Sequence, residues 1–218
     1  MTRSYQEDGC AAAHALSLVG DRWALLVVRE LLLGPKRFTD LRQGLPHISP
    51  NVLAQRLEDL EGSAIVRRRK LSPPAVAQVY ELTEWGRQLE PVVIALGRWA
   101  ARSPFLPSGH LNVDSLILSF LTMFDRHKAR GLSAVIELKF GDEAFHATIR
   151  RGHMELVRGS AARPDATIES DSDTLAEVVY AGGKFSALKV RGKRSVAKRF
   201  VSLFPLPERA PAAAIRRS

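Results

Sequence analysis

Hydrophobic residues in the first hundred positions recur at helical spacing within short segments that turn residues separate. Four short helices are predicted in order, over residues 10–19, 22–33, 38–44 and 50–61. Asp21 is expected to cap the second helix, because its carboxylate can accept from an orphan backbone N–H of the first turn. A tandem of short helices joined by tight turns predicts a helix-turn-helix.

The fourth of these helices has a strong start and two distinct faces. Ser49 is placed to cap it, and Pro50 follows at the first helical position, where its missing N–H has no effect. Leucines recur along one side at positions 53, 57 and 60, whereas Asn51 and Gln55 fall on the other side. A short helix with an apolar back and an amide-bearing front suits the major groove of DNA, so we predict a recognition helix here.

A basic hairpin is predicted directly after this helix. Residues 64–71 and 76–82 have strand patterns, and the loop between them contains Pro73-Pro74, which cannot continue a central strand. Four consecutive bases at positions 67–70 alternate in the first strand, so only two of them can face the same way. One pair is expected to reach DNA and the other to meet acidic residues or solvent. The alternative is a solvated charged edge that protects an exposed strand.

A long helix is predicted from its cap, Thr83, to about residue 102, with Pro91 inside it as a kink or a break. Its apolar positions are Leu89, Val92, Val93, Leu96, Trp99 and Ala100. A helix with an apolar face this broad either packs on its own domain or forms a dimer interface. The breadth favours the dimer, because such a face needs more cover than one neighbour provides.

The second half of the chain has a different pattern, which begins after a linker-like segment at residues 103–109. A helix is predicted over residues 114–130. Apolar and polar residues then alternate between positions 136 and 156, which predicts half-buried antiparallel hairpins. A strand at 165–170, a helix capped by Ser172 or Asp171, a strand at 187–190 and a helix at 193–204 complete the prediction.

These patterns predict an α+β protein of two domains. Residues 1–106 form a winged helix-turn-helix, and residues 107–218 form a helix-flanked antiparallel sheet. The first part carries 14 Lys+Arg and 11 Asp+Glu, and the second carries 18 and 12. The whole chain has a formal net charge of +9, which favours a polyanionic partner, nucleic acid first and an anionic membrane second. The alternative is a soluble protein that is merely basic.

Cysteine usage and hydropathy bear on the compartment. Cys10 is the single cysteine of the chain, so an intrachain disulfide is excluded and a reducing compartment is expected. The first ten residues show no secretory signal, and no apolar run approaches the ~20 residues of a membrane span. We therefore expect a cytoplasmic protein without a membrane span.

The first half resembles the HxlR-type branch of winged helix-turn-helix regulators. The residues that carry the resemblance are Cys10, Gly20-Asp21-Arg22-Trp23, Leu31 to Gly34, Arg37-Phe38-x-x-Leu41, Ile48-Ser49-x-x-x-Leu53-x-x-Arg56-Leu57-x-x-Leu60-Glu61, Pro73-Pro74 and Tyr80-x-Leu82-Thr83-x-x-Gly86. The resemblance covers about residues 8–102 and implies a homodimeric bacterial transcription factor that binds double-stranded DNA. It also implies that Cys10 can act as a thiol sensor, whereas the alanines around it favour a buried small hydrophobe instead.

The second half is similar to a sterol carrier protein-like domain over about residues 112–205. The cues are the order of helix and hairpins, the segment 164–168 before a capped helix, and the segment 188–192 before the last helix. The resemblance implies an apolar small-molecule ligand between sheet and helices. Phenylalanines on apolar faces are the candidate ligand residues, although most of them could simply fill a core: Phe120, Phe124, Phe140, Phe145 and Phe200.

The function predicted is a dimeric transcriptional regulator that reads a palindromic operator. The candidate DNA-binding residues are Lys36, Arg37, Ser49, Asn51, Val52, Gln55, Arg56, Arg67, Arg69 and Lys70. Arg56 lies at the flank of the apolar stripe, so it could instead meet an acidic neighbour. The alternative function is a carrier of lipid or another hydrophobic ligand, with the helix-turn-helix as an interaction module. Catalytic, metal-binding and dinucleotide motifs are absent, so we expect no enzyme, no cofactor and no metal.

Overall fold

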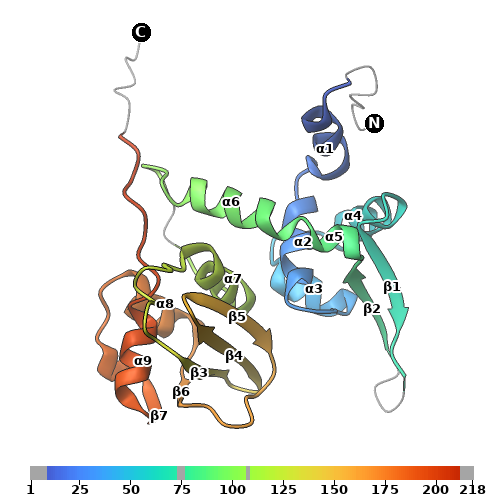
Figure 1. Cartoon of the computed structure of the whole chain (residues 1–218). Coiled ribbons are helices and arrows are strands. Elements are labelled where there is room, and N and C mark those ends of the chain that lie inside the picture. The colour runs from blue at the N-terminus through green and yellow to red at the C-terminus, as the bar shows by residue number, and fades with distance from the viewer. Residues whose placement is uncertain (1–8, 73–76, 107–108, 212–218) are drawn as a thin grey trace. The chain divides into compact units, whose positions relative to one another are not determined.

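The computed structural model describes residues 9–72, 77–106 and 109–211 (Figure 1). Contacts divide the chain into two compact units, Met1–Val93 and Ile94–Ser218. The predicted loop prolines, Pro73 and Pro74, lie outside the described residues. The fold class is α+β, as predicted, with helices and a hairpin in the first unit and a larger sheet in the second.

The first unit is a helix-turn-helix followed by a hairpin. Its helices and strands are α1 (Ala11–Val19), α2 (Ala24–Leu32), α3 (Phe38–Gly44), α4 (Pro50–Gly62), β1 (Val66–Lys70), β2 (Gln78–Leu82) and α5 (Glu84–Arg87). The strands β1 and β2 pair antiparallel, and Lys36 adds an isolated bridge to Tyr80. The predicted helices, the hairpin and the cap at Thr83, which accepts a hydrogen bond from the Gly86 N–H, are confirmed.

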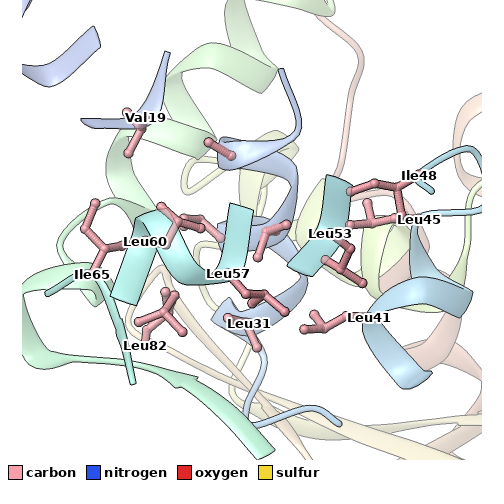
Figure 2. Close-up of a cluster of buried hydrophobic side chains, with 14 residues drawn as sticks. Val19, Leu31, Leu41, Leu45, Ile48, Leu53, Leu57, Leu60, Ile65 and Leu82 are labelled. Atoms are coloured by element: carbon pink, nitrogen blue, oxygen red, sulfur yellow. The ribbon is translucent and has the colours of Figure 1, made fainter. Parts of the chain in front are cut away.

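One core holds this unit together. Figure 2 shows Leu57 of α4 beside Leu31 of α2 and Leu53 of α4 near Leu41 of α3, with Leu60 of α4 in the same cluster. All five side chains are buried. Each buried aliphatic side chain of this size contributes about 1.5–3 kcal/mol through removal of apolar surface from water. The apolar stripe of α4 therefore fixes the helix on the unit and leaves the opposite side facing outward.

The predicted cap of α2 is wrong. The helix begins at Ala24 rather than at residue 22, and Trp23 precedes it with a left-handed backbone, φ 81°. The carboxylate of Asp21 does not cap α2, because it forms an ion pair with Arg56 of α4. The segment between α1 and α2 is therefore a turn whose acidic side chain holds α4.

The predicted long helix after the hairpin is broken in two. The short helix α5 ends at Arg87, and α6 (Glu90–Ala100) carries Pro91 in its first turn, where a proline is tolerated. The second unit begins within α6, before the boundary predicted at residues 106/107. The reason is that Arg98 donates two hydrogen bonds to the carbonyl oxygen of Thr122, at 3.0 and 2.7 Å.

The second unit is built on a five-stranded sheet with helices α7 and α9 packed against it and α8 beside α7 (Figure 1). Its elements are α7 (Val113–Met123), β3 (Ala134–Phe140), β4 (Glu143–Arg150), β5 (His153–Arg158), β6 (Ala166–Glu169), α8 (Ser172–Tyr180), the 3-10 turn η1 (Phe185–Ala187), β7 (Lys189–Gly192) and α9 (Arg194–Val201). The strand order is β5-β4-β3-β6-β7.

Two predictions for this unit need correction. The sheet is mixed rather than antiparallel, because β3 and β6 run parallel, with Ile136 opposite Ala166. The helix predicted over residues 114–130 ends at Met123, since the Asp125 carboxylate then accepts from the N–H groups of His127 and Lys128 and turns the chain. Local alternation identified the strands, but it could not identify their neighbours.

Candidate nucleic-acid interface

The helix α4 has the cap and the two faces that its sequence predicts. The Ser49 hydroxyl accepts a hydrogen bond from the Val52 N–H at 3.3 Å. Asn51 and Val52 lie exposed in the first turn, opposite the buried leucines. The side chain of Asn51 makes no hydrogen bond to another residue within the described ranges. An amide in this position has both its donor and its acceptor available for the edge of an adenine.

The second turn of α4 is held by a carboxylate of the third. The Gln55 amide donates to Asp59 at 2.9 Å, and Arg56 pairs with the other oxygen of Asp59 at the same distance. Arg56 also forms the ion pair with Asp21, and its side chain is largely buried. Of the two interpretations left open for Arg56, the structure therefore supports the acidic neighbour. Arg56 joins α4 to the turn before α2.

We call the hairpin the wing (β1, β2 and the loop between them). One carboxylate holds two of its four basic side chains. Glu81 of β2 is opposite Arg67 of β1. One oxygen of Glu81 accepts from Arg67 at 2.8 Å, and the other accepts from Arg69 at 2.9 Å. Burial by itself raises the pKa of Glu81, but the hydrogen bonds from Arg67 and Arg69 outweigh it and hold the pKa below its ordinary value. Glu81 is therefore ionised at neutral pH and keeps both guanidinium groups on one side of the wing.

The other side of the wing carries Arg68 and Lys70. Arg68 pairs with Glu61 at the end of α4 at 2.7 Å and lies over the ring of Tyr80, 5.8 Å from its centroid. Lys70 is exposed, and it forms no ion pair with any residue that the structure describes. The alternation predicted for the four bases is thus present, and carboxylates meet both sides rather than one.

The two bases before α3 have different environments. The Lys36 ammonium lies 2.5 Å from Oε2 of Glu30, whose side chain is fully buried. This contact makes Lys36 a structural lysine, so we do not retain it as a phosphate contact. Arg37 is exposed at the start of α3, where its backbone N–H donates to Asp40. Arg37 stays a candidate for the DNA backbone.

Sequence reasoning missed the acidic partners of these bases. Asp21, Glu30, Asp59 and Glu81 each hold one or two of the predicted DNA-binding residues in place. The partner of Arg67 could have been found from strand register, because residues opposite each other in a hairpin share a face. The pairs Asp21–Arg56 and Glu30–Lys36 depend on tertiary packing, and no local pattern shows them.

The first unit also exposes apolar surface. A groove of about 230 Å³ is lined by Ala15, Leu18, Val19, Ile65, Trp85, Gln88 and Leu89. Leu16 and Trp85 project from α1 and α5 beside it with half or more of their surface exposed. The helix α6 begins in the first unit and ends in the second, none of its eleven residues is buried, and Trp99, in the second unit, is 75% exposed. Apolar surface of this extent is typical of a protein–protein interface.

Cys10 is exposed directly before α1, not buried among the alanines. Backbone hydrogen bonds from Ala13 and Ala12 lower the pKa of its thiol. The N-terminus of a helix favours a thiolate in this way because unsatisfied N–H groups point at it.

The five phenylalanines predicted for a ligand site pack against each other instead. Phe120 and Phe200 are buried with ring centroids 5.8 Å apart, and Phe124 contacts the same cluster through Phe204. Phe140 and Phe145 form a separate edge contact at 6.4 Å. A ligand among these rings would have to displace one of them. Phe140 also lines an open pocket of about 480 Å³ at the end of the parallel strands β3 and β6.

The described residues contain no group of three or more His, Cys, Asp or Glu side chains that could hold a metal ion. No single helix in them has both the length and the hydropathy of a membrane span, and only α1 and α2 taken together, with an 80° bend between them, meet those criteria.

Comparison with known proteins matches the first part of the chain. The model of the family described as HxlR-like helix-turn-helix matches residues 18–104, less than half of the chain. The HTH-type transcriptional regulator YodB of Bacillus subtilis is 42% identical over 86 residues, which are 39% of this chain and 77% of YodB. The uncharacterized HTH-type transcriptional regulator YvaP of the same organism is 35% identical over 86 residues, which are 39% of this chain and 80% of YvaP. The solved structure of reduced YodB aligns at 36% identity with a TM-score of 0.41, covering 46% of this chain and all of that one.

The substitution Glu81→Gln tests the wing. It is expected to lower the free energy of unfolding by about 1–3 kcal/mol at neutral pH, because an amide replaces a carboxylate that accepts from two guanidinium groups. Since the folded-state pKa is lowered, this stabilisation is full above the unfolded pKa of about 4.3 and is lost as the pH falls through the lower folded value. Urea denaturation followed by tryptophan fluorescence should show the two proteins converging in acid. The exposed Glu84→Gln is the control, and a difference that persists unchanged at about pH 3 would contradict the assignment.

Alkylation tests the thiol of Cys10. Iodoacetamide should modify Cys10 in the folded protein at neutral pH at least as fast as in the urea-unfolded chain, because the thiol is exposed and its pKa is lowered. Mass spectrometry of the modified peptide measures both rates, and Cys10→Ser provides the blank. Slower modification in the folded protein than in the unfolded chain would remove Cys10 as a candidate sensor.

Proposed function

The chain belongs to the HxlR-like helix-turn-helix family, and on that premise we propose that it is a transcriptional regulator that reads DNA with α4 and the wing. The observation that supports this most directly is the division of α4. Its leucines are buried, its second and third turns are tied to Asp59, and Asn51 and Val52 of its first turn are exposed. A helix held in this way presents its N-terminal side chains to the bases, as recognition helices do.

Base readout is assigned first to Asn51. Its amide can bond the N6 and N7 atoms of adenine, and Val52 beside it offers apolar contact to a thymine methyl group. Gln55 has the same chemistry, but its amide donates to Asp59, so it must give up that bond to read a base. We therefore propose that Asn51 contributes more to sequence preference than Gln55.

Contact with the DNA backbone is assigned to the wing and to Arg37. Arg67 and Arg69 are 64% and 46% exposed although Glu81 holds them. A guanidinium has five N–H donors, so each side chain keeps donors for a phosphate after its bonds to Glu81 are made. Lys70 adds a cation at the end of β1.

We propose a homodimer, supported by the exposed apolar surface of α1, α5 and α6. A two-fold arrangement would place two copies of α4 in successive major grooves, about 34–36 Å apart, on a palindromic operator. The same surface would otherwise leave Trp85 and Trp99 in water.

For the second unit we keep the sterol carrier protein-like fold as a proposal. Its support is the order of a capped helix, two hairpin connections and two further helices. An apolar ligand that modulates the regulator would need a site other than the interior phenylalanine cluster, and the pocket beside Phe140 is one such place.

The substitution Asn51→Ala tests base readout. It should reduce the ratio of affinities for operator and random duplex by about 1–3 kcal/mol, because one two-point contact to a base is lost. Competition binding at ~150 mM salt measures that ratio on an operator selected from random sequences. Glu58→Ala, at an exposed position in the next turns of α4, should leave the ratio unchanged. An equal loss of affinity on both duplexes would count against base readout by Asn51.

A paired substitution on α6 tests the dimer. Leu96→Asp with Trp99→Asp should convert the dimer to a monomer, because two charges would enter an apolar interface. Size-exclusion chromatography with light scattering measures the mass. The matched control is Phe105→Asp with Leu106→Asp, which adds the same charge at two exposed apolar residues after α6. A dimer that survives the α6 change would refute this interface.

A further inference from the structure

The excess positive charge of the chain is concentrated outside the helix-turn-helix. Residues 1–93 contain 12 Lys+Arg and 11 Asp+Glu, a net charge of +1. Residues 94–218 contain 20 and 12, a net charge of +8. A nearly neutral DNA-reading unit attracts a polyanion weakly over distance, whereas the second unit attracts it strongly.

The exposed side of α9 is basic throughout. Arg194, Lys198 and Arg199 are exposed on this helix, while Ala197 and Phe200 on its other side are buried. Residues 188–204 include six Lys+Arg and no Asp or Glu. The helix thus buries Ala197 and Phe200 in its own unit, keeps Val196 and Val201 half-buried, and exposes chiefly cations and serines.

A second basic segment lies at the C-terminal end of α9. It is the turn of residues 125–131, which carries Arg126, Lys128 and Arg130. A guanidinium N–H of Arg199 donates to the carbonyl oxygen of Arg130 at 2.5 Å, and the Asp125 N–H donates to that of Leu203 at 2.8 Å. These bonds make the turn and α9 one continuous surface, which we call the α9 patch (residues 126–130 with Arg194, Lys198 and Arg199).

The carboxylates on and beside β6 pair with lysines outside the α9 patch. Asp165 pairs with Lys193 at 2.8 Å, and Glu169 pairs with Lys189 at 2.7 Å. Both pairs lie along β6 and β7. Within the described ranges, the side chains of Arg126, Lys128 and Lys198 form no ion pair. The Asp125 carboxylate at the start of the turn interacts electrostatically with Lys128 and offsets part of its charge. Six basic side chains against this one carboxylate leave the α9 patch with a net positive charge.

Stability of the helix does not explain the patch. Cations in the last turn, such as Lys198 and Arg199, favour a helix through its dipole by about 0.3–1 kcal/mol. Arg194 lies in the first turn, where a cation is unfavourable and an acidic residue is preferred, and this turn has no acidic residue. Arg194 lies over the ring of Phe185, 5.0 Å from its centroid, so a local contact rather than the helix dipole stabilises it.

We propose that the α9 patch is a sequence-independent contact surface for the sugar-phosphate backbone of DNA. The inference rests on the proposed function, because DNA is the polyanion that the first unit reads. The burial of Phe200 and Ala197 favours DNA over an anionic membrane, since an interfacial helix gains much of its membrane affinity by inserting its apolar face into the lipid. Lysine and arginine side chains bind phosphate oxygens without reading the nucleobases.

The test is the salt dependence of binding to a random duplex by the full-length protein. Each phosphate contact contributes about 0.9 to the slope of log Kobs against log salt concentration. Arg126→Ala, Lys128→Ala and Lys198→Ala together should make the slope shallower by up to about 2.7 for three lost contacts. The ratio of operator to random affinity should not change. The matched control removes three exposed cations of the same unit, with Arg163→Ala, Lys184→Ala and Arg209→Ala.

The outcomes separate this inference from the proposed function. A slope equal to that of the control triple, with operator binding intact, overturns the α9 patch and leaves the regulator in place. Failure of the wild-type protein to bind any duplex overturns both. Loss of binding to vesicles that contain phosphatidylserine, with an unchanged DNA slope, assigns the patch to membranes and also overturns the inference. The charge-preserving set Arg126→Lys, Lys128→Arg and Lys198→Arg should keep the wild-type slope, which a purely structural role would not require.

Discussion

The buried carboxylate of Glu30 is the contact on which the geometry of the DNA-reading unit depends. It lies on α2, and it accepts from Lys36 at 2.5 Å and from Arg29 at 2.8 Å. The backbone of Lys36 in turn bridges to Tyr80 of the wing through two hydrogen bonds. A Cβ at Gly44, the end of α3, would lie 2.2 Å from Oε2 of Glu30, so any side chain there would displace this carboxylate. One buried charge therefore connects α2, α3 and the wing, and an ion pair at such depth is costly to break from one side.

Ion pairs also hold the basic side chains that lie farther from Glu30. Asp21 and Asp59 hold Arg56 at the base of α4, Glu61 holds Arg68, and Glu81 holds Arg67 and Arg69. Each pair restricts a flexible side chain before any ligand is present, which reduces the entropy lost when it binds. The consequence is that Arg67 and Arg69 have two roles, since they stabilise the wing and also keep exposed donors for the phosphates proposed to contact it. Asn51 differs because it is exposed without such a tie.

The sequence was a good guide wherever the structure is determined locally. The predicted bounds of α3 are those observed, and the cap of α4 at Ser49 is confirmed, because caps and helical periodicity act over four residues. The predictions failed where the deciding partner is remote. Asp21 was expected to cap α2, but Arg56 lies 35 positions away in sequence. The parallel pairing of β3 with β6 likewise joins residues 30 positions apart, and alternation within a strand does not specify its neighbour. The same holds for the candidate site. Its helix could be predicted from local pattern, whereas the carboxylates that hold its basic side chains could not.

The balance of charge differs between the two units, and this difference bears on how each unit would contact DNA. In the first unit the number of acidic side chains nearly equals the number of basic side chains, so its net charge is small and its long-range field is weak. Such a surface is suited to discrimination at close range, where the position of one amide decides which base is accepted. On the proposal made for α9, the attraction for DNA comes from the second unit, whose positively charged face does not contact nucleobases. Long-range attraction then depends mainly on the second unit and base discrimination on the first, whose wing and Arg37 add phosphate contacts at close range.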